Sequence, residues 1–247
     1  MKQLNRREVL AGAAALFLGD SLASAEVIRG KLPFNPSSAA TQQPIDPSGW
    51  KYFTAQEAMT MEAIVDRLIP PDPVTPGGKD AGCAVYIDRQ LAGAYGHREG
   101  LYVQGPFHEG SKQQGPQSAE DPAQQYRQAL AQFDRLARQR HGGDANITFA
   151  KLGAAEQDEI LKGVESGELP FEGLDGKKFF EHLVSDAQQG FFADPIYGGN
   201  RDMCAWKMIG YPGARYDYRD WVGRHNEPYP YPPVSLLGRR DWNPGAK

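Results

Sequence analysis

The sequence has few of the residues from which cofactor and metal sites are built. Cysteine occurs only at Cys83 and Cys204, so this chain alone forms neither a CxxCH haem attachment nor a cysteine-ligated iron–sulfur cluster. His97 and His108 lack the i, i+4 spacing that places two imidazoles on one helix face. Neither G-x-G-x-x-G after a strand nor G-x-x-x-x-G-K-[ST] occurs. We therefore expect no metal and no cofactor in this chain.

Long apolar runs and a strong basic charge are also missing. Beyond Leu18 no apolar run approaches the roughly 20 residues of a membrane span. The 27 basic and 31 acidic residues give a formal net charge of −4, which argues against nucleic acid as a partner. We expect a soluble or peripheral mature protein.

No catalytic constellation is evident. A G-x-S-x-G nucleophile elbow does not occur. Asp186, Asp194 and Asp202 stand near one another in the sequence, but each has a structural interpretation. We expect Asp186 on a solvated helix face, Asp194 in a turn with Pro195, and Asp202 in the first turn of a helix. We expect the chain itself not to be catalytic; the alternative is a stand-alone periplasmic hydrolase or binding protein that uses the Asp194/Asp202 region.

The N-terminus has the features of an export signal. Arg6 and Arg7 precede an apolar run over 9–18 and the small-residue cleavage pattern Ala23–Ala25. We interpret residues 1–25 as a twin-arginine signal peptide that is cleaved after Ala25, which places the mature chain in the periplasm. The twin-arginine route exports folded proteins, often with a cofactor or a bound companion. Because this chain has no cofactor motif, the signal indicates a companion.

Helical periodicity dominates the middle of the chain. Residues 26–50 are expected to form an extended lead-in, and residues 51–213 one compact, mainly α domain of about six helices with long loops. The capping and periodicity signals predict helices over 54–69, from a cap at Asp80, from Pro122 after the cap Asp121, over 154–166, from a cap at Asp175 to Gly190, and over 200–209 with Asn200 as cap.

The stretch Gln188–Tyr216, QQGFFADPIYGGNRDMCAWKMIGYPGARY, has no helical or alternating period through most of its length. Large rings stand among glycines, which allow positive φ and close backbone approach. We interpret this stretch as a shaped docking surface. Its expected interface or structural residues are Phe191, Phe192, Asp194, Pro195, Tyr197, Gly198, Gly199, Asn200, Trp206, Lys207, Gly210, Tyr211, Pro212 and Gly213.

The last segment, residues 214–247, is rich in aromatic, proline and arginine residues and has no folding period. Glu227–Pro233 favours a polyproline conformation. We expect an extended C-terminal arm that contacts a partner, because rings and guanidinium groups are typical of protein interfaces. The alternative is an arm that wraps its own domain.

The two cysteines have several possible fates in an oxidising compartment. A disulfide between Cys83 and Cys204 would join two predicted helices and close a long loop. A bond from either cysteine to a partner chain, or two free buried thiols, are the competing interpretations.

Several separated motifs resemble those of the gluconate 2-dehydrogenase subunit 3 family. They are the twin-arginine leader, LIPPDPVTPGGKDAGCAVYIDRQL, the Gly105-Pro106-Phe107 insertion and DPIYGGNRDMCAWKMIGYPG, and they cover about Tyr52–Tyr216. The positions matched to the family are Asp194, Pro195, Tyr197, Gly198, Gly199, Asn200, Trp206, Lys207, Gly210, Pro212 and Gly213. The tail after Tyr216 departs from the simplest members.

The resemblance implies a small, non-catalytic γ subunit of an oxidoreductase complex. Its expected partners are a large FAD subunit of the glucose-methanol-choline type, which oxidises gluconate or a related sugar, and a multihaem cytochrome c that passes electrons to the membrane. The small subunit is then expected to export, mature and stabilise the FAD subunit, at the periplasmic side of the inner membrane. Within the docking surface, Tyr197 and Trp206 are the expected interface anchors.

Overall fold

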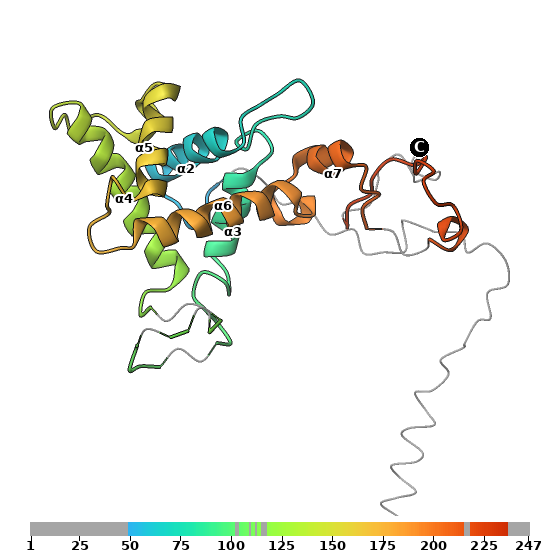
Figure 1. The fold of residues 1–247 in the computed structure, drawn as a ribbon, viewed down its shortest axis with the longest axis horizontal. Helices are drawn as coiled ribbons and strands as arrows, with labels where there is room; N and C mark the ends of the chain where they lie inside the picture. The colour runs from blue at the N-terminus through green and yellow to red at the C-terminus, as the bar shows by residue number, and fades with distance from the viewer. Residues whose placement is uncertain are drawn as a thin grey trace, which may run out of the picture. The chain divides into compact units, whose positions relative to one another are not determined.

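A computed structural model describes residues 49–101, 104–108, 110, 111, 113, 114, 118–214 and 218–236 of the chain. The predicted signal peptide, including Arg6, Arg7, Ala23 and Ala25, and almost all of the predicted lead-in lie outside the described residues. The described residues form six α-helices, α2 to α7, with short 3-10 turns between them and no strands (Figure 1). The predicted mainly α fold class is confirmed.

The first described helix, α2, spans Ala55–Leu68 and begins at the predicted capping box. The Thr54 side chain accepts from Glu57 N, and the Glu57 carboxylate accepts from Thr54 N at 2.8 Å. Two N–H groups that the first turn leaves without helical partners are thereby satisfied. Met61, Ile64 and Val65 form the buried stripe of the helix, as their spacing predicts.

Helix α3 spans Cys83–Leu91 and is not capped by Asp80, so that prediction is wrong. The residue at its N-cap is Gly82, and no side chain caps the helix. Asp80 instead lies in the turn that precedes Gly82. Helix α4 spans Pro122–Arg140, and Asp121 caps it by accepting from Gln124 N at 2.8 Å, as predicted.

Helix α5 spans Ala154–Ser166, which matches its predicted bounds. Helix α6 spans Gly176–Phe192 from its predicted cap Asp175, but it continues through Gly190. Gly190 is buried inside the helix because the Tyr86 side chain packs on it: an added Cβ would lie 3.0 Å from Tyr86 Cδ1. The glycine therefore serves helix packing and does not end α6.

Helix α7 spans Cys204–Ile209, so the predicted start at residue 200 is wrong. Residues Arg201–Met203 form a separate 3-10 turn in which Asp202 has φ 56°. Asp202 is therefore not in the first turn of the α-helix. Asn200 still serves α7, because its Oδ1 accepts from Ala205 N at 2.9 Å.

The core lies among α2, α3, α4, α5 and most of α6. We call residues 55–187, which end before the last turn of α6, the helical body. Edge-to-face ring pairs join its parts: Phe133 on α4 packs on Phe149 of the 3-10 turn Phe149–Lys151 with centroids 5.4 Å apart, and Tyr126 on α4 packs on Phe179 on α6 with centroids 5.0 Å apart. Figure 1 shows α7 beyond the C-terminal end of α6, away from α4 and α5. In the part of the chain that the structure describes, no helix combines the length and apolarity required to cross a bilayer.

Buried carboxylates fasten segments to the helical body. Asp88, which is fully buried, accepts from the backbone N–H groups of Lys51, Tyr52 and Phe53 at 2.8, 2.9 and 2.9 Å. Its other neighbour is Arg89, whose Nη1 lies 2.6 Å from Asp88 Oδ2. The carboxylate therefore fixes the chain just before α2, where the lead-in joins the domain.

Candidate docking surface

The region that follows α6 is held in place by two polar side chains. Asp194 begins the 3-10 turn Pro195–Tyr197 by accepting from Ile196 N at 3.0 Å, which confirms its predicted place in a turn. Asn200 is fully buried, and its Nδ2 donates to Ala193 O at 2.9 Å. Because the Oδ1 of the same amide accepts from Ala205 N, Asn200 links the end of α6 to α7.

Gly198 and Gly199 allow this region to press against two helices. Gly198 has φ 94°, and an added Cβ would lie 2.9 Å from Val85 Cγ1 on α3. An added Cβ at Gly199 would lie 2.0 Å from Gly190 O on α6. Real Cβ atoms do not approach a backbone oxygen so closely, so only glycine fits. The residues around this corner, 188–213, are called the motif region below.

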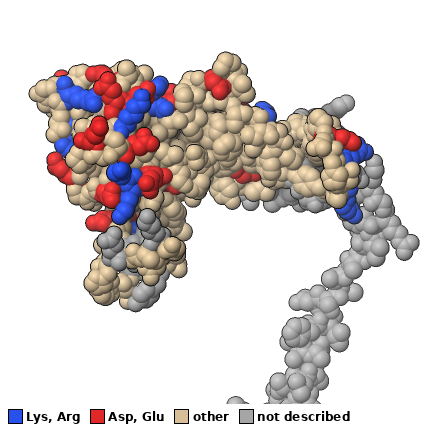
Figure 2. Space-filling model, in the orientation of Figure 1, with Lys and Arg blue, Asp and Glu red and all other residues tan. Residues whose placement is uncertain are grey.

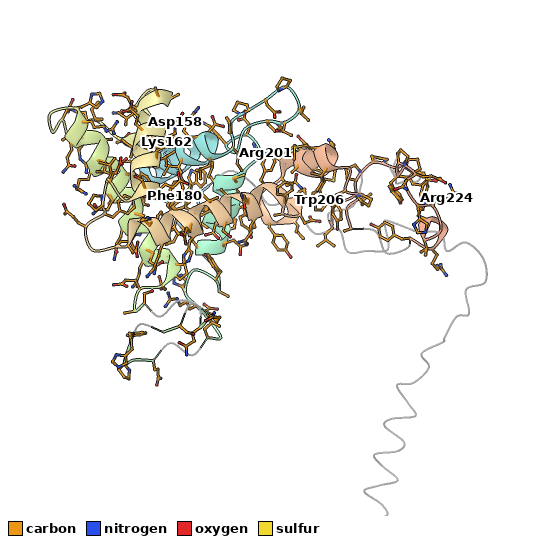
Figure 3. All side chains as sticks on the ribbon, viewed as in Figure 1. Asp158, Lys162, Phe180, Arg201, Trp206 and Arg224 are labelled. Carbon is orange, nitrogen blue, oxygen red and sulfur yellow. The ribbon has the colours of Figure 1, made fainter. Side chains whose placement is uncertain are left out.

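Trp206 belongs to the interior of the motif region. The side chain is 6% exposed, and its Nε1 donates to Phe192 O at 2.8 Å. The Tyr211 ring packs edge-to-face on the indole with centroids 5.0 Å apart. Figure 3 labels Trp206 where α7 meets the end of α6. Trp206 is therefore a core residue of this chain, in contrast to Tyr197, which is 49% exposed.

The other predicted residues of the motif region also differ in burial. Phe191, Gly199, Asn200 and Gly213 are buried; Asp194, Pro195, Gly198 and Pro212 are half-buried; Phe192, Lys207, Gly210 and Tyr211 are exposed. Sequence periodicity gave no means of separating these groups, because the region has no period. The exposed members show which part of the region is available to another molecule.

Large apolar side chains are exposed along the motif region. Their exposed fractions run from 42% at Phe192 and Met208 to 57% at Ile209, with Tyr211 and Tyr197 between them. We call these five side chains the docking face. Met208 and Ile209 were not predicted, because the sequence of the short helix α7 gives no signal of which side chains are exposed. Figure 2 shows Lys, Arg, Asp and Glu gathered over the α4 and α5 side of the helical body, with few charges around α7.

A pocket of about 410 Å³ opens at the edge of the docking face. It lies between α3, the end of α6 and the 3-10 turn after α6, and its lining residues are Tyr86, Gln90, Gln189, Phe192, Ala193, Asp194 and Tyr197. The Tyr86 hydroxyl lies 3.5 Å from Gln189 Oε1. Burial raises the pKa of Tyr86, so its hydroxyl stays protonated at neutral pH.

The described part of the C-terminal arm, 218–236, returns to the motif region. Val234 N donates to Pro212 O at 3.2 Å, and Ala214 N donates to Val234 O at 2.6 Å. Leu236 N donates to Asp194 Oδ2 at 2.9 Å. The described part of the arm therefore packs on its own domain at Val234 and Leu236, which was the alternative to contact with a partner. Trp242 and Tyr216 lie outside the described residues.

Before its attachment at Val234, the described part of the arm contains clustered rings. Trp221 and Tyr229 pack edge-to-face at 5.1 Å, and the Arg224 guanidinium lies 4.6 Å from the Trp221 ring centroid. Such ring and cation–π contacts give an otherwise irregular segment a local structure.

Asp186 is buried, so its predicted place on a solvated face is wrong. The carboxylate is 8% exposed and accepts from the hydroxyls of Tyr126 at 2.6 Å and Tyr95 at 3.1 Å. Burial raises the pKa of Asp186, while the two hydroxyl bonds oppose the rise. The network ties α6 to α4 and to the loop after α3. Asp194 has a different role, because its two oxygens accept from backbone N–H groups.

Of the fates considered for the two cysteines, the structure has free thiols at both Cys83 and Cys204 and no disulfide between them. Burial raises the pKa of Cys83 to about 12, with a smaller contribution from Cys204. Cys204 is only partly buried, and burial also raises its pKa. Both groups are therefore protonated and poorly nucleophilic at neutral pH.

In the stretches that the structure describes, no group of three or more His, Cys, Asp and Glu side chains is placed to hold a metal ion. His97 Nδ1 instead lies 3.5 Å from Asp121 Oδ2, beside the start of α4. The described residues thus form a small helical protein with large apolar side chains exposed on its motif region.

Comparison with protein families places the chain in one of them. The sequence model of gluconate 2-dehydrogenase subunit 3 matches residues 55–213, which is more than half of the chain. The chain therefore belongs to the gluconate 2-dehydrogenase subunit 3 family, whose members are subunits of multi-subunit dehydrogenase complexes. The match begins with α2 and ends at Gly213, so it contains the whole motif region. Comparison with curated proteins and with solved structures gave no match.

Proposed function

We propose that this chain is the non-catalytic small subunit of a periplasmic, FAD-dependent gluconate or sugar dehydrogenase complex at the inner membrane. Its docking face holds the large FAD subunit, and its twin-arginine signal exports the two together. The complex also contains a multihaem cytochrome c that receives the electrons. The FAD and the haems belong to those partners, and the small subunit contributes export, maturation and stability.

The exposed docking face within the family-matched region carries this proposal. Burying side chains such as Ile209 and Tyr197 against a partner removes apolar surface from water, at about 25 cal/mol per Å². The face rests on a corner fixed by Asn200 and by close glycine packing, so little conformational entropy is lost when a partner binds. Such a preorganised apolar surface suits a permanent complex.

The alternative, hydrolysis by Asp194 and Asp202, finds less support. Asp194 Oδ1 and Oδ2 accept from Ile196 N and Leu236 N, so the carboxylate already has a structural role. Asp202 is exposed in the 3-10 turn before α7. Neither carboxylate has the paired environment that general acid–base catalysis requires.

Co-expression tests the proposed function directly. The candidate FAD subunit from the neighbouring genes is expressed with and without this chain, and periplasmic dye-linked dehydrogenase activity is measured. We expect activity in the periplasm only when this chain is present. A variant with Arg6 and Arg7 both changed to lysine is the matched control, because it keeps the charge and should leave the active flavoprotein in the cytoplasm. Equal periplasmic activity without this chain would contradict the proposal.

A further inference from the structure

The pocket beside the docking face differs chemically from the face itself. Its walls contain the rings of Tyr86, Phe192 and Tyr197 together with the amides of Gln90 and Gln189. Asp194 is the one charged residue among its described lining residues, which include no lysine, arginine or histidine. A carboxylate in a ring-lined pocket attracts a cation and repels an anion, so a free sugar acid does not suit this pocket.

The Asp194 carboxylate is held in a fixed position. Ile196 N donates to Oδ1 at 3.0 Å, and Leu236 N donates to Oδ2 at 2.9 Å. Each carboxylate oxygen has two lone-pair sites, so each can still accept another hydrogen bond. The acceptor pair is therefore preorganised for a donor that enters the pocket, and the side chain loses little entropy when the donor arrives.

The rings narrow the choice of cation. A guanidinium group is planar, weakly hydrated and able to stack on aromatic faces, whereas an ammonium group is compact and strongly hydrated. Phe192 and Tyr197 are 42% and 49% exposed and both line the pocket, so their side chains are accessible to such a group. A guanidinium group therefore matches both the rings and the fixed carboxylate.

We propose that this pocket receives an arginine side chain of the large catalytic subunit, with the guanidinium group paired to Asp194 beside the Phe192 and Tyr197 rings. This inference rests on the proposed function, because it names the part of the partner that meets the docking face. The apolar face then contributes buried area, and the pocket fixes which surface of the partner docks and in which orientation.

Charge changes of opposite sign at Gln189 test the proposal. Gln189 lines the pocket from exposed helix surface, so its variants should fold normally. In binding measurements with the purified FAD subunit, Gln189→Glu should lower the Kd and Gln189→Lys should raise it, each by about threefold. The same two changes at Gln188, which is exposed on α6 but does not line the pocket, are the matched controls and should move the Kd by less than about twofold.

Two further measurements identify the group. Asp194→Asn should raise the Kd at least about tenfold, since it removes the charge that faces the buried guanidinium group. Treating the FAD subunit with phenylglyoxal, which modifies arginine, should abolish binding, and prior complex formation should protect one arginine. Binding that survives the modification, or Gln189 variants that shift the Kd in the same direction, would overturn the arginine proposal. Absence of binding by the unchanged chain would instead overturn the proposed function.

Discussion

The helical body and the motif region present different surfaces. On the helical body, charged side chains pair across helices, as in Arg67–Asp158 at 2.7 Å and Arg140–Glu159 at 2.7 Å. On the motif region, five large apolar side chains, Phe192 and Ile209 among them, lie exposed within residues 192–211, whereas the exposed apolar side chains of the helical body, such as Met59, are spread along the chain. Partly exposed ion pairs contribute little stability but keep a surface in water, whereas exposed apolar side chains gain free energy only when they are covered. This difference supports the proposal that the motif region meets the partner.

Both regions nevertheless fix their chain in the same way. Buried acceptors bind backbone N–H groups: Asp88 holds residues 51–53, and Asn200 holds Ala205. The docking face is therefore apolar without being loosely folded. Variants and labelling experiments on the isolated chain test this contrast between the two regions.

The largest effect is expected for Trp206→Ala. The indole is 6% exposed and fills the space between α7 and the end of α6, so its removal should lower the free energy of unfolding by about 3–5 kcal/mol. Urea denaturation of the isolated chain measures this loss. A loss of unfolding free energy below about 1 kcal/mol would show that Trp206 does not stabilise the core and would favour the role of an interface anchor.

A somewhat smaller loss is expected for Asp88→Asn in the helical body. The amide is neutral and can accept only at its oxygen, so the backbone donors of Lys51, Tyr52 and Phe53 lose their charged acceptor and at least one of them loses its acceptor altogether. We expect a loss of about 2–3 kcal/mol in urea denaturation. The control Asp202→Asn lies on exposed surface and should change stability by less than about 0.5 kcal/mol; equal effects of the two variants would contradict the fastening role of Asp88.

Lowering the pH should reduce the cost of burying the Asp186 carboxylate, because its pKa is raised in the folded chain. Because the folded pKa lies above the unfolded value, the folded state binds the proton first as pH falls. The stability of the unchanged chain relative to Asp186→Asn should therefore increase as pH falls through the folded pKa towards the unfolded value near 3.8. Urea denaturation at a series of pH values measures this difference, and a relative stability that decreases on acidification would contradict it.

Thiol labelling should distinguish the two cysteines by rate. Cys83 is fully buried with a pKa raised to about 12, so it should resist alkylation in the folded chain at pH 8. Cys204 is only partly buried and should react first. Mass spectrometry of peptides after iodoacetamide treatment resolves the two sites; faster labelling at Cys83 would show that α3 opens more readily than α7.

Sequence reasoning reached the helices through their local signals. Thr54 and Asp121 cap their helices as predicted, because a capping bond involves residues only three positions apart. It failed at Gly190 and Asp186, because their roles depend on Tyr86, Tyr95 and Tyr126, which are distant in sequence.

The docking surface was predictable in composition and not in detail. The crowding of rings and glycines marked the motif region, and the family match over residues 55–213 contains it. Whether a ring faces solvent depends on the tertiary fold, so Trp206 and Tyr197 could not be told apart. The exposed Met208 and Ile209 were missed for the same reason.

The central claim is that the exposed rings serve assembly and the buried ring serves folding. Its most direct test is the Kd between the FAD subunit and the Tyr197→Ala variant, with the unfolding free energy of the isolated variant measured in parallel. We predict that binding weakens by about 2 kcal/mol or more, while the unfolding free energy changes by less than about 0.5 kcal/mol. Unchanged affinity together with a destabilised isolated chain would contradict the claim.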